Sequence, residues 1–134
     1  MNVDGACHCG GIRYEAVVDP RRVVLCHCAD CQTISGAPYR ANIRAPAATV
    51  RLSGQPKTYA KIGGSGETVV TAFCGVCGTA LYSCKGEAPE HLWLRLGAIR
   101  QRAELEPAAQ GFCESALAWS MDITGVRRIA TNGR

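Results

Sequence analysis

The sequence predicts a mainly β fold built of short strands, with little helix. Fifteen glycines and six prolines divide the chain into short runs, and apolar residues alternate with polar residues in several of them. Turn-forming residues separate the runs at "SGQP", "GGSG" and "KGEAPE". Seven or eight short strands joined by such turns are typical of a curled sheet or a sandwich.

The run "GIRYEAVVD" is the first predicted strand. Its residues Ile12, Tyr14 and Ala16 alternate with Arg13 and Glu15, which indicates one buried and one exposed face. Further strands are predicted at Val23–Cys26, Tyr39–Ile43, Thr49–Ser53, Thr58–Ile62, Thr68–Phe73, Ala80–Ser83 and Leu92–Leu96. Helix is predicted only for a short run and a weaker piece, Ala29–Ser35 and Gln101–Glu104.

Length and composition predict one globular domain over residues 1–134, because domains commonly run to about 100–200 residues. Hydrophobic residues make up 47% of the chain and charged residues 19%, which argues against disorder. The start, "MNVDGACHCGG", lacks the pattern of a signal peptide, and no apolar run approaches the roughly 18 residues of a membrane span. We therefore expect a cytoplasmic protein whose thiols stay reduced and which has no membrane partner.

The formal net charge of +4 counts every cysteine as neutral. If seven cysteines bound two Zn²⁺ as thiolates, they would contribute about −3 together and leave about +1. Aromatic residues amount to 6% of the chain, and no run of basic residues stands out. Composition therefore does not favour a nucleic-acid partner.

Seven of the nine cysteines fall into three tight groups. These groups are Cys7-x-Cys9, Cys26-x-Cys28-x-x-Cys31 and Cys74-x-x-Cys77. In a reducing compartment such spacing indicates metal ligands more than disulfides. The segment "FCGVCGTALY" is typical of a zinc-binding turn, because its glycines allow a tight bend that directs two sulfur atoms to one point.

A division of the seven cysteines into four and three follows from the preference of structural zinc for four ligands. Two pairs complete one site, and the triple makes a second site with one open position. Because the triple is contiguous, we expect the two pairs Cys7 and Cys9, Cys74 and Cys77 to act together. A single di-zinc cluster with bridging thiolates is one alternative. In another, the open position is filled by one of four residues: His27, His8, Cys84 or Cys113.

Three of these four residues also have a purely structural interpretation. The side chain of His27 should point away from the metal, since His27 lies between two ligands, and it would then be a surface or supporting polar residue. Cys84 and Cys113 fit the pattern of small buried apolar residues.

Zinc held by three thiolates would carry a charge of about −1 and would favour a soft ligand such as a substrate thiolate. Reactions at a thiol or a thiol adduct are therefore the chemistry most natural to the triple. The motifs of zinc proteases and of serine hydrolases, H-E-x-x-H and G-x-S-x-G, do not occur in the sequence.

Four stretches together span about Gly5 to Trp119: "GACHCGGIRYE", "LCHCADCQTISGAPY", "GSGETVVTAFCGVCGTALY" and "LRLGAIRQRAELEP…ALAWS". In this order they resemble the glutathione-dependent formaldehyde-activating enzyme family, also called the centromere protein V type. The resemblance implies a β-tent fold of curled antiparallel sheets, two zinc sites and a carbon–sulfur lyase that joins glutathione and formaldehyde into S-hydroxymethylglutathione.

Carried over residue by residue, the resemblance implies the same division of ligands. Cys7, Cys9, Cys74 and Cys77 match the structural zinc site, and Cys26, Cys28 and Cys31 match the catalytic zinc site. The expected cofactors are thus two Zn²⁺ per chain, and the expected partner is a small thiol such as glutathione.

The sequence departs from the family pattern at three places. Gln32 replaces a common arginine, Ile99-Arg100 replaces a common Leu-Asp pair, and Gly111 or Phe112 stands where a histidine is common. These departures concern the substrate more than the fold or the metals. Candidate anchors for an anionic substrate are Arg40, Arg44, Lys57 and Lys61, and the turn at Ser65-Gly66 is a candidate wall of the pocket.

Three hypotheses about function follow. The first is an enzyme of the carbon–sulfur lyase type that uses the open zinc site. The second is a non-catalytic zinc-binding module for a protein or nucleic-acid partner. In the third, both zinc ions only stabilise the fold.

Overall fold

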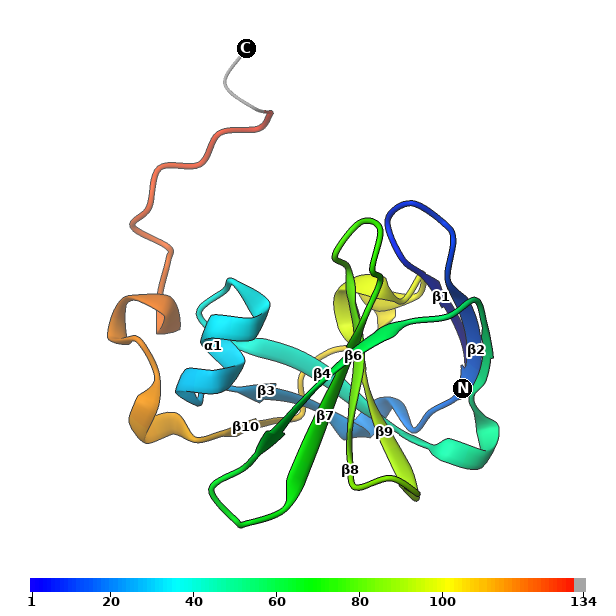
Figure 1. The fold of residues 1–134 in the computed structure, drawn as a ribbon. Coiled ribbons are helices and arrows are strands. Elements are labelled where there is room, and N and C mark those ends of the chain that lie inside the picture. Colours follow the sequence, from blue (N-terminus) through cyan, green and yellow to red (C-terminus); the bar gives the residue numbers. More distant parts are fainter. Residues whose placement is uncertain (132–134) are drawn as a thin grey trace.

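The computed structural model describes residues 1–131, which form two β-sheets and one α-helix (Figure 1). The smaller sheet is antiparallel, with the strand order β1 (Asn2–Ala6), β2 (Arg13–Val17) and β5 (Arg51–Ser53). The larger sheet has the strand order β10 (Ala109–Gly111), β3 (Val23–Cys26), β4 (Arg40–Pro46), β9 (His91–Arg95), β8 (Ala80–Lys85), β7 (Thr68–Phe73) and β6 (Lys57–Ile62). The predicted mainly β class is confirmed.

Helical structure is short throughout the described residues. The α-helix is α1 (Ala29–Ser35), which has seven residues. Six 3₁₀ turns occur: η1 (Pro20–Arg22), η2 (Ala47–Thr49), η3 (Leu96–Ala98), η4 (Arg102–Glu104), η5 (Cys113–Ser115) and η6 (Ala118–Met121). Within residues 1–131, no helix has the length and apolar character that crossing a membrane requires.

The predicted elements are found close to their expected places. The bounds of β3, β7 and α1 are as predicted, and the other predicted strands differ by at most three residues at either end. Strands β1 and β10 were not predicted, because neither "NVDGA" nor "AQG" shows an alternation long enough to indicate a strand. Strand β10 runs parallel to β3, whereas all other strand pairs are antiparallel as expected.

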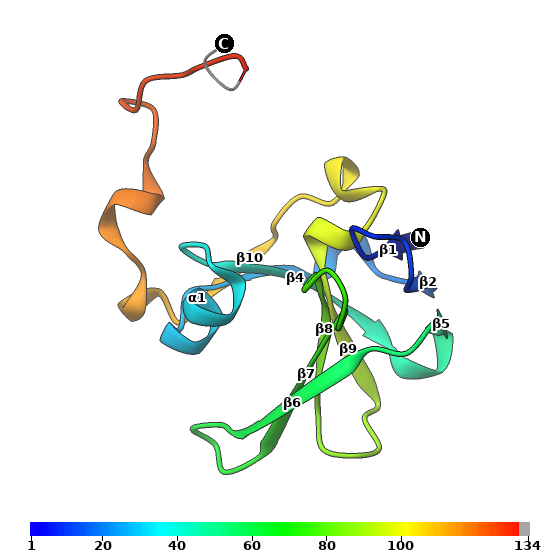
Figure 2. The ribbon, with the colours of Figure 1, turned by 45° about the horizontal axis from the view of Figure 1, so that its top comes forward.

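The hydrophobic core lies between the small sheet and one face of the large sheet. Alternate residues of β2 face inward, and the central strands of the large sheet contribute Ile43 and Leu94, both fully buried. The large sheet twists strongly, so that β6–β9 stand at a steep angle to β3, β4 and β10 (Figures 1 and 2). This twist supports the prediction of a curled sheet in part.

The opposite face of the large sheet carries buried polar residues. Asn42 on β4 pairs with Arg95 on β9, Ser83 on β8 pairs with Trp93, and Thr71 on β7 pairs with Ser83. Directly paired residues share a face, so Asn42, Thr71, Ser83 and Arg95 all lie on the face away from the core. All four are at most 6% exposed. Strand β3 and helix α1 bring a cysteine cluster to this same face.

Candidate metal centres

The first cluster joins the two sheets. Cys7 and Cys9 follow β1, and Cys74 and Cys77 follow β7. Both turns have one hydrogen-bonding pattern. The amide of the first cysteine donates across the turn, to the Ile12 oxygen from Cys7 and to the Thr79 oxygen from Cys74, each at 2.9 Å. A glycine with positive φ then donates back to that cysteine, and this glycine is Gly10 in one turn and Gly78 in the other.

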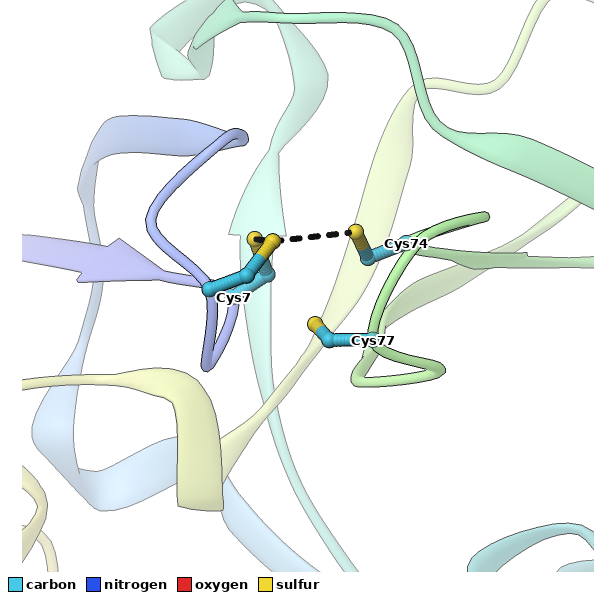
Figure 3. Close-up of side chains that lie close together, drawn as sticks. Cys7, Cys74 and Cys77 are labelled. Atoms are coloured by element: carbon cyan, nitrogen blue, oxygen red, sulfur yellow. Dashed lines mark hydrogen bonds between the residues drawn. The ribbon is translucent and has the colours of Figure 1, made fainter.

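The sulfur geometry of this four-cysteine cluster fits a tetrahedral metal ion. A Zn–S distance of about 2.3 Å implies S···S separations of about 3.8 Å. The Sγ atom of Cys9 lies 3.5 Å from that of Cys7 and 3.8 Å from that of Cys74, and all four Sγ atoms lie within 4.8 Å of one another. Figure 3 shows the sulfur atoms of Cys7, Cys74 and Cys77 directed toward one another. The cluster can therefore hold a metal ion.

Strand β3 and helix α1 build the second cluster. Cys26 is the last residue of β3, Cys28 caps the start of α1, and Cys31 lies within α1. The Sγ atoms of Cys26 and Cys28 are 3.6 Å apart, and the amide of Cys31 donates to the Sγ of Cys28 at 3.3 Å. All three Sγ atoms lie within 4.8 Å of one another, so this three-cysteine cluster can also hold a metal ion. All nine cysteines of the chain are free of disulfides.

The thiols of the three-cysteine cluster influence one another. A hydrogen bond from the Cys31 thiol lowers the pKa of Cys26, and the charge of Arg40 lowers it further. The same hydrogen bond and burial raise the pKa of Cys31.

The four alternative ligands lie outside both clusters. Among residues 1–131, no further histidine, cysteine or carboxylate joins the group of Cys26, Cys28 and Cys31. Cys84 is buried in the hydrophobic core, as predicted. Cys113 was expected to be buried and is exposed instead, because it lies on the short turn η5 at the surface.

His27 supports the metal loop from the core side. His27 was predicted to be either a surface residue or a supporting polar residue. It is fully buried, so the surface alternative is wrong. Its Nε2 atom lies 2.8 Å from the Oε1 atom of Gln110 on β10, and its ring meets that of Tyr39 edge to face. A cavity of about 420 Å³ is lined by these three side chains and by Leu25, residues 107–109, Ser120 and Met121, so it lies beside the cluster and not within it.

Gln32, the departure nearest to the cluster, makes two backbone contacts. Its Nε2 atom donates to the carbonyl oxygen of His27 at 2.7 Å and to that of Ser115 at 2.9 Å. Gln32 thus connects α1 to the metal loop and to the C-terminal segment.

The candidate substrate anchors are dispersed. Arg40 stands directly opposite Cys26 in the pairing of β4 with β3. Lys61 on β6 pairs with Asp30 of α1 at 2.6 Å, and Arg44 contacts His91 at 2.8 Å. Lys57 packs against the turn at Gly75, and Ser65-Gly66 forms the turn between β6 and β7. Of these residues, Arg40 lies nearest to the cluster in the sheet.

Arg95 and Asn42 were not singled out from the sequence. The Nη1 atom of Arg95 donates to the Oδ1 atom of Asn42 at 2.5 Å, on the same sheet face as Cys26 and Arg40. The available signal was a single arginine in the apolar run "HLWLRLG", at a position that alternation assigns to the face away from the core.

Comparisons with known proteins agree with the fold and with the resemblance described above. Residues 2–115 match the model of the family described as "Glutathione-dependent formaldehyde-activating enzyme". A protein from Halomonas elongata carries a provisional form of the same name. It is 32% identical to this chain over 95 residues, which are 67% of this chain and 60% of the relative. The chain thus spans less than two thirds of the length of that relative. A crystal structure of a Rhodobacter sphaeroides protein is similar in fold, with a TM-score of 0.62 and 19% identity over 80% of this chain and 98% of the other.

Proposed function

Because the chain belongs to the glutathione-dependent formaldehyde-activating enzyme family, we propose that it is a zinc-dependent enzyme of the carbon–sulfur lyase type. Its substrate would be a small thiol such as glutathione together with a carbonyl compound such as formaldehyde. In the forward reaction the thiol sulfur bonds to the carbonyl carbon, and the thiol proton passes to the resulting hydroxyl group. In the reverse reaction the carbon–sulfur bond breaks.

The observation that carries this proposal is the unequal make-up of the two clusters. Four cysteines surround one centre, whereas three surround the other. A closed shell is typical of a structural zinc ion, and an incomplete protein shell is typical of a zinc ion that meets substrate. We therefore assign Cys7, Cys9, Cys74 and Cys77 to a structural zinc and Cys26, Cys28 and Cys31 to a catalytic zinc.

When bound, zinc would stabilise the thiolate form of a thiol near neutral pH. The protein's own residues hold this centre in place. Cys28 is fixed by the amide of Cys31, and Gln32 holds the loop through the His27 carbonyl. A fixed centre favours the reaction because it keeps the thiol and the carbonyl compound together in one orientation.

We also propose that residues 1–134 act as a single domain in the cytoplasm. Free cysteines at metal-ligand spacing fit a reducing compartment.

The test measures the exchange between glutathione, formaldehyde and S-hydroxymethylglutathione by NMR, with zinc-loaded protein. We expect faster exchange than in buffer and a shift of the glutathione resonances. Cys28→Ser should abolish both effects. Cys113→Ser, which removes an exposed thiol outside both clusters, is the matched control and should retain both. Equal exchange with Cys28→Ser and with the unmodified protein would contradict the proposal.

A further inference from the structure

Arg95 is a buried cation without a carboxylate partner. It is 6% exposed, and among residues 1–131 it is the one Arg, Lys, Asp or Glu that is buried. Its Nη1 atom donates to Asn42 at 2.5 Å and to Ser83 at 3.3 Å, whereas its Nε and Nη2 atoms are buried and make no hydrogen bond within the described residues. A buried charge is strongly unfavourable unless an opposite charge lies nearby.

The pairing of the strands places Arg95 next to the three-cysteine cluster. Arg95 is paired with Asn42, Asn42 is paired with Val24, and Cys26 lies two residues further along β3 on the same face. Two strand spacings of about 4.8 Å and one step of about 6.6 Å between alternate residues separate the two backbones, roughly 12 Å in all, a gap that an extended arginine side chain and a cysteine side chain can bridge. Arg40 is paired with Cys26 itself and also carries a buried Nε atom without a partner.

The groups that shift the pKa of Arg95 are those of the three-cysteine cluster and Arg40. Burial, and next the positive charge of Arg40, lower the pKa of Arg95 to about 9. Cys31 and Cys26 act in the opposite direction and raise it, which agrees with their place beside Arg95. None of the ion pairs among residues 1–131 includes Arg95.

We propose that Arg95 is the counter-charge of the three-cysteine centre and that this centre needs it to hold a divalent metal ion tightly. Three thiolates and one divalent ion carry about −1, which one guanidinium neutralises. Arg40 supplies a second positive charge on the same face, suited to an anionic substrate group beside the centre. The inference rests on the metal site of the proposed function and adds a positioning residue to it.

The four-cysteine cluster serves as an internal control. It lies at the ends of β1 and β7 and is partly open to water at Cys9, whereas Arg95 lies on β9 beside the three-cysteine cluster. Loss of Arg95 should therefore leave the four-cysteine cluster unchanged.

The experiment loads the full chain with Co²⁺ and follows the sulfur-to-cobalt absorption during competition with a chelator. The unmodified protein should bind about two ions. Arg95→Gln should weaken one site by about tenfold to 100-fold, as loss of supporting partners of metal ligands usually does, and should leave the other unchanged. Arg95→Lys, which keeps the charge, should recover most of the lost affinity. Arg51→Gln, which makes the same change at an exposed position on the small sheet, is the matched control and should alter neither site.

Each outcome decides between the two proposals. If the unmodified protein binds a single ion, the metal site of the proposed function fails. If it binds both ions and Arg95→Gln binds both as tightly, only the role of Arg95 is overturned. Equal losses in Arg95→Lys and Arg95→Gln would overturn the charge argument, as would a loss of glutathione binding with both metal sites intact. If Arg95→Gln does not fold, Arg95→Met takes its place, since it keeps the length of the side chain and removes the charge; affinity equal to that of the unmodified protein in that variant overturns the proposal.

Discussion

Gln32 of α1 donates from its Nε2 atom to the carbonyl oxygen of His27 at 2.7 Å. His27 lies between two cysteines of the metal loop, and the same Nε2 atom also donates to Ser115 at 2.9 Å. One amide group therefore holds together the metal loop, the helix and the C-terminal segment.

We predict that Gln32→Glu lowers the free energy of unfolding by about 1–2 kcal/mol, because the substitution replaces a donor with an acceptor facing two carbonyl oxygens. It should also weaken metal binding at the three-cysteine cluster, since the loop is no longer fixed. Urea denaturation and chelator competition measure the two effects.

The matched control for Gln32→Glu is Gln55→Glu, an exposed position in the turn before β6. This control makes the same change of charge and should behave like the unmodified protein. If both variants show equal stability and equal metal affinity, the hydrogen bonds of Gln32 do not support the loop.

Metal removal should separate the two clusters. A chelator should take the ion from the three-cysteine cluster first, because three thiolates and an exchangeable position hold an ion less tightly than four thiolates. Circular dichroism should then remain that of the folded protein, since the four-cysteine cluster still joins the ends of β1 and β7. Removal of the second ion should unfold the chain.

Substitutions separate the same two roles. Cys28→Ser should reduce the metal content by about one ion per chain and keep the fold, whereas Cys74→Ser should lower the melting temperature. Simultaneous loss of both ions with unfolding, in either variant, would favour two purely structural sites.

The hydroxyl group of Tyr14 is buried and forms no hydrogen bond within the described residues. We predict that Tyr14→Phe raises the free energy of unfolding by about 1 kcal/mol at neutral pH, because an unsatisfied polar group is removed. Burial, and next the charge of Asp4, raise the pKa of Tyr14.

A raised pKa has a defined effect on alkaline stability. The contribution of neutral Tyr14 is complete below the pKa of the unfolded chain, about 10, and is lost as the pH rises above it, by up to about 1.4 kcal/mol per pH unit. Tyr14→Phe should lack this part of the alkaline loss. Urea denaturation at pH 8 to 11 measures the difference, and parallel curves for both proteins would contradict the prediction.

The sequence was sufficient for the features that depend on local pattern. Alternation and turn residues predicted β3, β7 and α1 with their bounds, and cysteine spacing predicted both clusters that the fold assembles. The features that it missed depend on the partner strand. The segment of β10 is ordered by parallel pairing with β3, and no local property of "AQG" indicates this.

The polar sheet face was missed for a similar reason. An arginine in a predicted strand usually points to solvent, and only the assembled sheet shows that Arg95 lies buried beside Asn42. From the sequence, Gln32 was notable only because it replaces a common arginine. Its own hydrogen bond to Ser115 could not be predicted, because it depends on the fold bringing Ser115 next to α1.

Gly5 of β1 lies in close contact with Tyr14 and with the turn η3. A Cβ atom at Gly5 would lie 2.3 Å from the Cζ atom of Tyr14 and 2.6 Å from the carbonyl oxygen of Ala98. The ring of Tyr14 is packed in the core and the Ala98 oxygen belongs to the backbone, so neither can move away freely. We predict that Gly5→Ala lowers the free energy of unfolding by about 1–3 kcal/mol through overpacking.

Gly97 is the matched control for Gly5, because a Cβ atom there would contact no described atom within 4 Å. Gly97→Ala should change the free energy of unfolding by less than about 0.5 kcal/mol. Since Cys7 follows Gly5 by two residues, Gly5→Ala should also weaken metal binding at the four-cysteine cluster and leave the three-cysteine cluster unchanged. Denaturation curves and metal competition test both effects. Equal stability of the two alanine variants would mean that β1 does not pack against Ala98 as closely as the structure has it.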